Sequence, residues 1–86
     1  MQVVVYGRSD RTCMACRATK RALKRHGVVY EFHNVDTDPD AEAYARALGV
    51  LELPVVTWND GDETGGFWSG YRPDEIKRLA PGNDAV

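Results

Sequence analysis

The sequence predicts an α/β fold in which a mixed four-stranded sheet is flanked by helices. A continuous β-branched run opens the chain at residues 3–5, and helical patterns then alternate with further apolar runs. A strong turn signal at residues 59–62 separates the last two apolar runs, which indicates an antiparallel hairpin. The predicted order is therefore β-α-β-α-β-β-α, and 86 residues leave room for one domain.

The first half predicts two strands joined by a helix. Residues 2–6 form a fully buried strand, because their apolar run is continuous rather than alternating. Residues 13–26 form a helix that Gly27 ends, and residues 28–35 form the second strand. A right-handed crossover is expected to join these parallel strands. The apolar face of the helix consists of Ala15, Ala18, Ala22 and Leu23.

The second half predicts a helix, a hairpin and a last helix. Asp38 is a suitable cap for the middle helix, and Pro39 takes its first position. Residues 53–58 form the third strand, and the fourth contains residues 67–68. Pro73 opens the last helix. The core-facing positions of these two helices are Ala41, Tyr44, Ala45 and Leu48 in the first, and Ile76 and Leu79 in the second.

This topology is the thioredoxin-like architecture in its short form. We expect a single domain over residues 1–80 and a flexible tail over residues 81–86. No segment has the apolar length of a membrane span, and the N-terminal apolar run stops too early for a signal peptide. The expected protein is a cytoplasmic monomer, and cytosolic cysteine pairs are rarely structural.

The chemistry is expected at Cys13 and Cys16, which are the chain's two cysteines and stand at the start of the first helix. A thiolate is the nucleophile in disulfide exchange, and a helix N-terminus favours the anion. Cys13 is therefore the expected attacking thiol and Cys16 the resolving one. Two other interpretations are inert core cysteines and part of a zinc site. Zinc needs about four ligands, and the spacing to His26 and His33 fits no common finger.

Charge is unevenly distributed although the net charge is only −2, which argues against a nucleic-acid binder. Residues 31–42 carry acids and no Lys or Arg. Residues 11–25 carry the opposite pattern, with no acid and with Arg11, Arg17, Lys20, Arg21, Lys24 and Arg25. This basic segment beside the cysteines either steers an acidic protein partner or forms an ordinary solvated helix face.

Leu53 and Pro54 precede the third strand, where this topology places a loop beside the cysteine pair. X-Pro bonds are usually trans, but the fold favours a cis bond here. The backbone of Leu53 is then expected to face Cys13 and to pair with an extended substrate segment.

The chain resembles the NrdH-redoxins, a glutaredoxin-like branch of the thioredoxin superfamily. Residues 68–74, Trp-Ser-Gly-Tyr-Arg-Pro-Asp, are similar to the family signature W-S-G-[FY]-R-P-[DE]. Residues 6–8, 18–23 and 53–56 extend the resemblance over nearly the whole chain. The resemblance implies a dithiol electron donor to the large subunit of class Ib ribonucleotide reductase. Its electrons would come from NADPH through thioredoxin reductase, with no bound cofactor or metal.

The resemblance also implies roles for individual residues. Cys13 and Cys16 form the redox pair, and Leu53 and Pro54 the substrate-facing corner. A second segment, consisting of Trp68, Ser69, Gly70 and Arg72, would replace a glutathione site and shape partner choice. Thr12 and Met14, which flank Cys13, are further expected partner contacts. For Trp68, an ordinary core tryptophan is the alternative.

Two departures from the family pattern are visible. Met14 and Ala15 stand between the cysteines where members more often have Val-Gln or Met-Gln, and the hairpin is longer than usual. Gly65 and Gly66 look like a glutaredoxin glycine pair, but we interpret them as loop flexibility. A glutathione-dependent glutaredoxin is the alternative function, and a metal-binding or adaptor module is a third.

Overall fold

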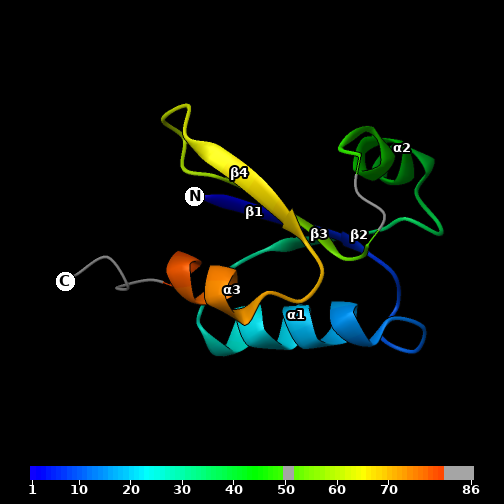
Figure 1. Ribbon diagram of the computed structural model, residues 1–86, viewed down its shortest axis with the longest axis horizontal. Helices are drawn as coiled ribbons and strands as arrows, with labels where there is room; N and C mark the ends of the chain where they lie inside the picture. The colour runs from blue at the N-terminus through cyan, green and yellow to red at the C-terminus, as the bar shows by residue number, and fades with distance from the viewer. Residues whose placement is uncertain (50–51, 81–86) are drawn as a thin grey trace.

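The computed structural model describes residues 1–49 and 52–80 (Figure 1). The predicted tail at residues 81–86 lies outside the described residues. The described elements follow the predicted order. They are β1 (Gln2–Gly7), α1 (Met14–Arg25), β2 (Glu31–Asn34), α2 (Pro39–Ala47), β3 (Val55–Asn59), β4 (Gly65–Ser69) and α3 (Pro73–Leu79).

The strands form one mixed sheet in the order β2-β1-β3-β4. β1 pairs with β2 in parallel and with β3 antiparallel, and β3 and β4 form the expected antiparallel hairpin. α1 and α3 cover one face of the sheet, and α2 lies on the other (Figure 1). The predicted thioredoxin-like fold is confirmed.

Two apolar clusters hold these layers together. The larger one joins α1 and α3 to the sheet, and its fully buried anchors are Leu23 and Ile76. The smaller one packs Ala41 and Ala45 of α2 against Val55 of β3. Burying a Leu or Ile side chain contributes about 1.5–3 kcal/mol, so these contacts hold α1 and α3 against the sheet.

The second strand is shorter than predicted, because the end of α1 uses the residues expected to open it. Gly27 has a φ of +75°, and its N–H donates to the carbonyl of Lys24. The N–H of Val28 donates to the carbonyl of Leu23, which completes a Schellman motif. Val28 is buried against the core, whereas Val29 is 88% exposed. The strand therefore begins only at Glu31.

The hairpin also differs from prediction. Gly65 and Gly66 belong to β4, paired with Asn59 and Trp58, and are not a loop. A Cβ on Gly65 would lie 2.6 Å from the carbonyl oxygen of Trp58, and one on Gly66 would lie 3.2 Å from its indole nitrogen. The glycines therefore let the strand pass close to Trp58. β3 begins at Val55, two residues later than predicted.

The buried face of α1 is rotated from the predicted one. Its buried residues are Cys16, Thr19, Ala22 and Leu23, whereas Ala15 and Ala18 are half-buried. Cysteine is fully buried more often than alanine, so the helix turns Cys16 toward the core in preference to Ala15 and Ala18. The rotation turns Cys16 into the core and leaves Cys13 at its edge.

Candidate functional site

The two cysteines form a disulfide at the start of α1, with Cα atoms 5.2 Å apart. Cys13 is the N-cap residue, with extended backbone, and Cys16 lies in the first turn. Cys16 is fully buried, whereas Cys13 is half-buried. Only Cys13 is therefore within reach of a second protein.

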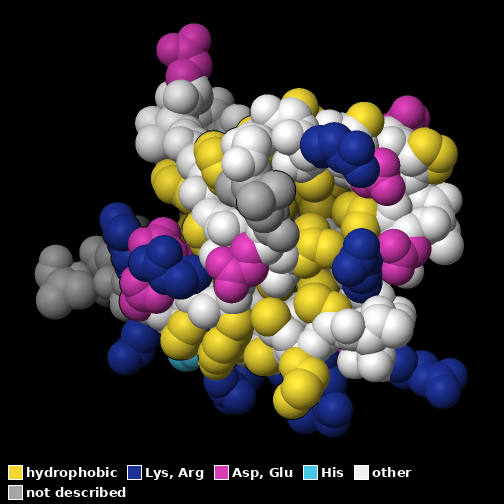
Figure 2. Space-filling view, turned by 45° about the vertical axis from the view of Figure 1, so that its right-hand side comes forward, with side chains coloured by type: hydrophobic (Ala, Val, Ile, Leu, Met, Phe, Trp, Pro, Cys, Tyr) yellow, Lys and Arg dark blue, Asp and Glu magenta, His cyan; other side chains and the backbone are white. Residues whose placement is uncertain are grey.

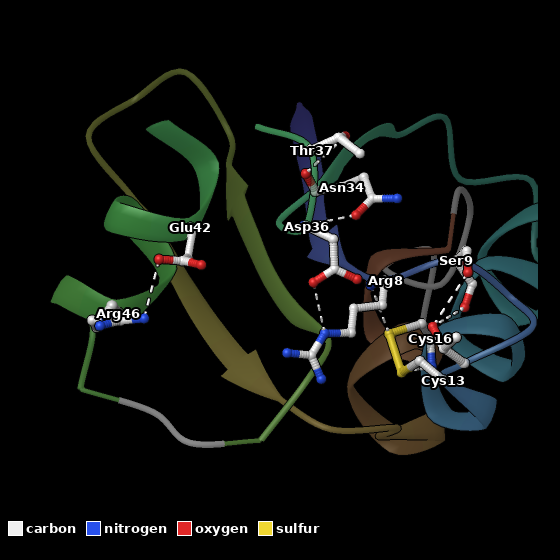
Figure 3. Close-up of polar contacts among 10 residues, drawn as sticks. Arg8, Ser9, Cys13, Cys16, Asn34, Asp36, Thr37, Glu42 and Arg46 are labelled. Atoms are coloured by element: carbon white, nitrogen blue, oxygen red, sulfur yellow. Dashed lines mark hydrogen bonds and ion pairs between the residues drawn. A yellow bond between two sulfur atoms is a disulfide. The ribbon is translucent and has the colours of Figure 1, made fainter. Parts of the chain in front are cut away.

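Two backbone N–H groups point at the sulfur atoms. The N–H of Cys16 donates to Sγ of Cys13 at 3.1 Å, so this sulfur caps the helix. The N–H of Arg8 donates to Sγ of Cys16 at 3.4 Å (Figure 3). Helix N-termini carry about half a positive charge. Acidic residues stand in the first turns of α2 and α3, but α1 has none, so no carboxylate competes with the sulfur.

Gly7 ends β1 directly against the disulfide. A Cβ on this residue would lie 2.8 Å from Sγ of Cys16 and 3.4 Å from Cβ of Pro54. Only glycine lets the strand approach this closely. Sequence reasoning gave Gly7 no role, although a glycine between a buried strand and a dithiol loop was an available signal.

Arg8 ties the same strand end to the loop before α2. Its Nε donates to Oδ1 of Asp36 at 3.1 Å, and the N–H of Asp36 donates to Oδ1 of Asn34 at 2.8 Å. Figure 3 shows the Arg8 side chain extending from the neighbourhood of the disulfide toward Asp36. The ion pair is half-exposed, so it adds little stability.

The two residues expected to flank Cys13 are both exposed. Thr12 closes the preceding turn, and its hydroxyl donates to the carbonyl of Ser9 at 3.3 Å. Met14 is 86% exposed on the outer side of α1. An exposed methionine beside a reactive sulfur is an adaptable apolar contact.

The structure brings the two predicted substrate segments together. The Leu53–Pro54 bond is cis, as expected, and Pro54 is buried. The carbonyl of Pro54 accepts from the N–H of Gly70 at 2.8 Å. Gly70 has a φ of +80°, and its position faces the carboxylate of Glu52, 2.9 Å from where a Cβ would be. Ser69 at the end of β4 pairs with Val55, so the β4–α3 connection that follows it lies beside the Leu53–Pro54 corner.

Trp68 and Arg72 occupy different surroundings. Trp68 is 6% exposed within the main core cluster, which is the core position that the sequence left as its alternative. Arg72 lies on the surface and binds the carboxylate of Asp74 through two hydrogen bonds of 3.2 and 2.9 Å. This bidentate bond lowers the pKa of Asp74 and raises that of Arg72.

The described histidines and acids form no metal-binding group at the sulfurs. Within residues 1–49 and 52–80, no group of three or more His, Cys, Asp or Glu side chains is arranged to hold a metal ion. His26 caps the C-terminal end of α1, and the ring of His33 stacks on Tyr6. His26 and His33 therefore belong to no such group among the described residues. None of the helices described is long and apolar enough to span a membrane.

A dithiol that caps the first helix of a thioredoxin-like fold, with one sulfur accessible and the other buried, defines a thiol–disulfide oxidoreductase. Comparison with known proteins agrees with this class. Residues 3–61 match the family model described as Glutaredoxin.

The chain is 44% identical to the glutaredoxin-like protein NrdH of Escherichia coli strain K12, over 100% of this chain and 98% of that one. It is 31% identical to the NrdH of Lactococcus lactis strain IL1403, over 91% and 99%. The structure of the Escherichia coli NrdH-redoxin superposes with a TM-score of 0.81, covering 94% of this chain and 97% of that one. A glutaredoxin from Archaeoglobus fulgidus gives 0.70 at 29% identity, covering 94% and 87%. The chain therefore belongs to the glutaredoxin family, among its glutaredoxin-like NrdH proteins.

Proposed function

We propose that this protein donates electrons to the large subunit of class Ib ribonucleotide reductase and is recharged by thioredoxin reductase at the expense of NADPH. The observation that carries the proposal is the helix-capping disulfide in a chain similar to NrdH over its full length. The related Escherichia coli redoxin is described as having a thioredoxin-like activity profile. In this proposal the protein works in the cytoplasm, as a monomer with no bound cofactor.

The reaction is a two-electron exchange. In the reduced protein, the thiolate of Cys13 attacks one sulfur of the partner's disulfide, forms a mixed disulfide and releases the first partner thiolate. Cys16 then loses its proton and attacks Sγ of Cys13. The mixed disulfide breaks, the second partner thiolate leaves, and the Cys13–Cys16 disulfide forms. The partner gains two electrons and two protons.

The two backbone donors have separate roles in this scheme. The N–H of Cys16 and the helix N-terminus stabilise negative charge on Cys13, both when it attacks and when it is the leaving group. The N–H of Arg8 stabilises charge on Cys16 as it resolves the mixed disulfide. Burial keeps Cys16 away from other disulfides.

The partner's segment is proposed to lie against the corner formed by Leu53 and Pro54. A shallow groove of about 380 Å³ runs beside it, lined among others by Arg8, Leu53 and Val55. We propose that the partner also contacts Thr12 and Met14, which are exposed on either side of Cys13, and the segment that contains Ser69, Gly70 and Arg72. Trp68 supports that segment from the core rather than touching the partner.

The same segment argues against glutathione as the reductant. The N–H of Gly70 is already bonded to Pro54, and the guanidinium of Arg72 is held by Asp74. The carboxylate of Glu52 next to Gly70 would repel the carboxylates of glutathione. These donors are therefore not free to bind the tripeptide.

A coupled assay tests the proposal. NADPH oxidation is followed with the oxidised protein and either thioredoxin reductase, or glutathione with glutathione reductase. We expect turnover only with thioredoxin reductase, and none after Cys13→Ser. The class Ib enzyme should then form deoxyribonucleotides with this protein as its sole reductant. Recharging by glutathione alone would contradict the proposal and favour the glutaredoxin alternative.

A further inference from the structure

The outer face of α1 forms a groove that begins at Met14, the residue after Cys13. Its floor is a single helical stripe, and Tyr71 of the β4–α3 connection forms the facing wall. The groove has a volume of about 400 Å³. Because Met14 directly follows Cys13, a segment lying in the groove is continuous with one that reaches the sulfur. The stripe consists of Met14, Arg17, Ala18, Arg21 and Arg25.

The arginines of this groove have no ion-pair partner in the part of the chain that the structure describes. Among the described residues, Arg17, Arg21 and Arg25 form no ion pair, whereas five other basic side chains do (Arg8, Lys20, Arg46, Arg72 and Arg78). The nearby carboxylate of Asp10 is bound by Lys20 at 2.6 Å. Three guanidinium groups therefore share one groove without an ion pair to any described carboxylate, although the whole chain carries a net charge of −2.

Apolar surface accompanies this charge. Met14 is 86% exposed and Tyr71 40% exposed, at the end of the groove nearest to Cys13 and on its wall. Figure 2 shows Lys and Arg side chains gathered along the lower margin, below exposed apolar side chains, on the side where Figure 1 places α1. Arginine next to an aromatic and a methionine is a composition typical of protein interfaces.

We propose that this groove binds an acidic segment of the disulfide partner, with an apolar side chain of that segment against Met14 and Tyr71. The inference rests on the proposed function and names the chemistry of the partner. From Met14 to Arg25 the helix rises about 16 Å, which matches about five residues of extended chain. The segment adjoins the partner's cysteines, because Met14 at the end of the groove directly follows Cys13.

Two synthetic peptides test the groove. Each carries the same intramolecular disulfide, followed by five residues. In one peptide these are Asp and Glu with one Leu; in the other, Asn and Gln replace the acids. Reduced protein is mixed with each peptide, and the second-order rate is followed by tryptophan fluorescence. We expect the acidic peptide to react roughly tenfold faster at low ionic strength, with the advantage shrinking as salt is added.

Paired variants separate the effect of the groove arginines on the rate from the effect of the protein's net charge. Arg21→Glu with Arg25→Glu should abolish the advantage of the acidic peptide, and Arg21→Lys with Arg25→Lys should retain it. Lys77→Glu with Arg78→Glu changes the net charge equally on α3, outside the groove, and should keep most of the advantage. Circular dichroism checks that each variant folds.

Three results would overturn the inference. The first is an equal rate for the two peptides. The second is an equal loss of the acidic peptide's rate advantage in the Arg21/Arg25 and the Lys77/Arg78 double Glu variants. The third is inhibition of the reaction by single-stranded RNA but not by an acidic peptide without a disulfide. The proposed function fails in a different way. In that case the wild-type protein would reduce neither peptide, or thioredoxin reductase would not recharge it.

Discussion

A glycine, which has no side chain, and two backbone N–H groups determine the surroundings of the disulfide. Gly7 leaves the space that Sγ of Cys16 fills, while the N–H groups of Arg8 and Cys16 each face one sulfur. None of these features is a charged side chain, so the sulfur pair is stabilised by the chain's own backbone.

Replacement of Gly7 tests this arrangement. Gly7→Ala puts a Cβ 2.8 Å from a buried sulfur, so the end of β1 must shift. We expect a loss of about 1–3 kcal/mol in the free energy of unfolding of the oxidised protein, measured with denaturant. Gly66→Ala is the matched control, because its Cβ would meet the partly exposed Trp58 ring at 3.2 Å. Equal losses in both variants would contradict the special role of Gly7.

The Arg72–Asp74 pair should make the stability of the fold depend on pH. The pKa of Asp74 is lowered by its bond to Arg72, so the pair stabilises the fold above the ordinary carboxylate pKa of about 3.9. That contribution disappears as pH falls through the lowered value. Arg72→Gln should raise the pKa of Asp74 in an NMR titration, and its stability deficit should vanish in acid. An unchanged Asp74 titration would show that the bond is not formed in solution.

The three helices begin in different ways, and the difference assigns their tasks. α2 is capped by the carboxylate of Asp38, which accepts from the N–H groups of Asp40 and Ala41. α3 begins at Pro73 with acids in its first turn. α1 is capped by a sulfur and has no acid there. Of the three helices, only α1 therefore has a reactive group at its positively charged N-terminal end.

The cap of α2 can be tested separately from the redox site. Asp38→Ala removes the acceptor for two N–H groups and should cost about 1 kcal/mol of stability, as measured by urea unfolding. Asp38→Asn keeps an acceptor and should recover most of that loss. Disulfide exchange should proceed at the wild-type rate in both variants. A large change in exchange rate would mean that α2 positions the dithiol more directly than the contacts indicate.

Local signals made much of the fold predictable. The Asp38-Pro39 start, the hairpin and the order of elements depend on neighbours in sequence, and the structure has them. The turn spans residues 60–64 rather than the predicted 59–62, because Asn59 still pairs with Gly65. The late start of β2 could not be predicted, because it follows from the Schellman motif that uses Val28. The placement of Gly65 in β4 depends on the partner strand.

The same division applies to the candidate site. The cysteine pair and its position at a helix start were visible in the spacing of the residues. The contact of Gly7 with Cys16 and the burial of Trp68 depend on packing between segments far apart in sequence. The groove arginines could not be separated from Lys20 by sequence, because only the fold brings Asp10 to Lys20.

At the scale of the whole molecule, the sheet and its two apolar clusters act as a frame for one sulfur. Cys16 is buried in the core, whereas Cys13 lies at its edge as the N-cap of α1. The arginine-lined groove on α1 begins at the next residue, Met14. Sγ of Cys13 is therefore accessible, accepts a backbone N–H and lies at the positive end of a helix. The central claim is that this atom is the nucleophile and that the helix end favours its thiolate.

Alkylation of the reduced protein tests that claim most directly. The rate at which iodoacetamide modifies Cys13 is measured against pH in the Cys16→Ala variant, which leaves a single thiol. The account predicts a half-maximal rate at a pH below the pKa of a free cysteine, about 8.5, and faster reaction than an unstructured peptide at neutral pH. A midpoint at or above that value, or a thiol that reacts only after unfolding, would contradict it.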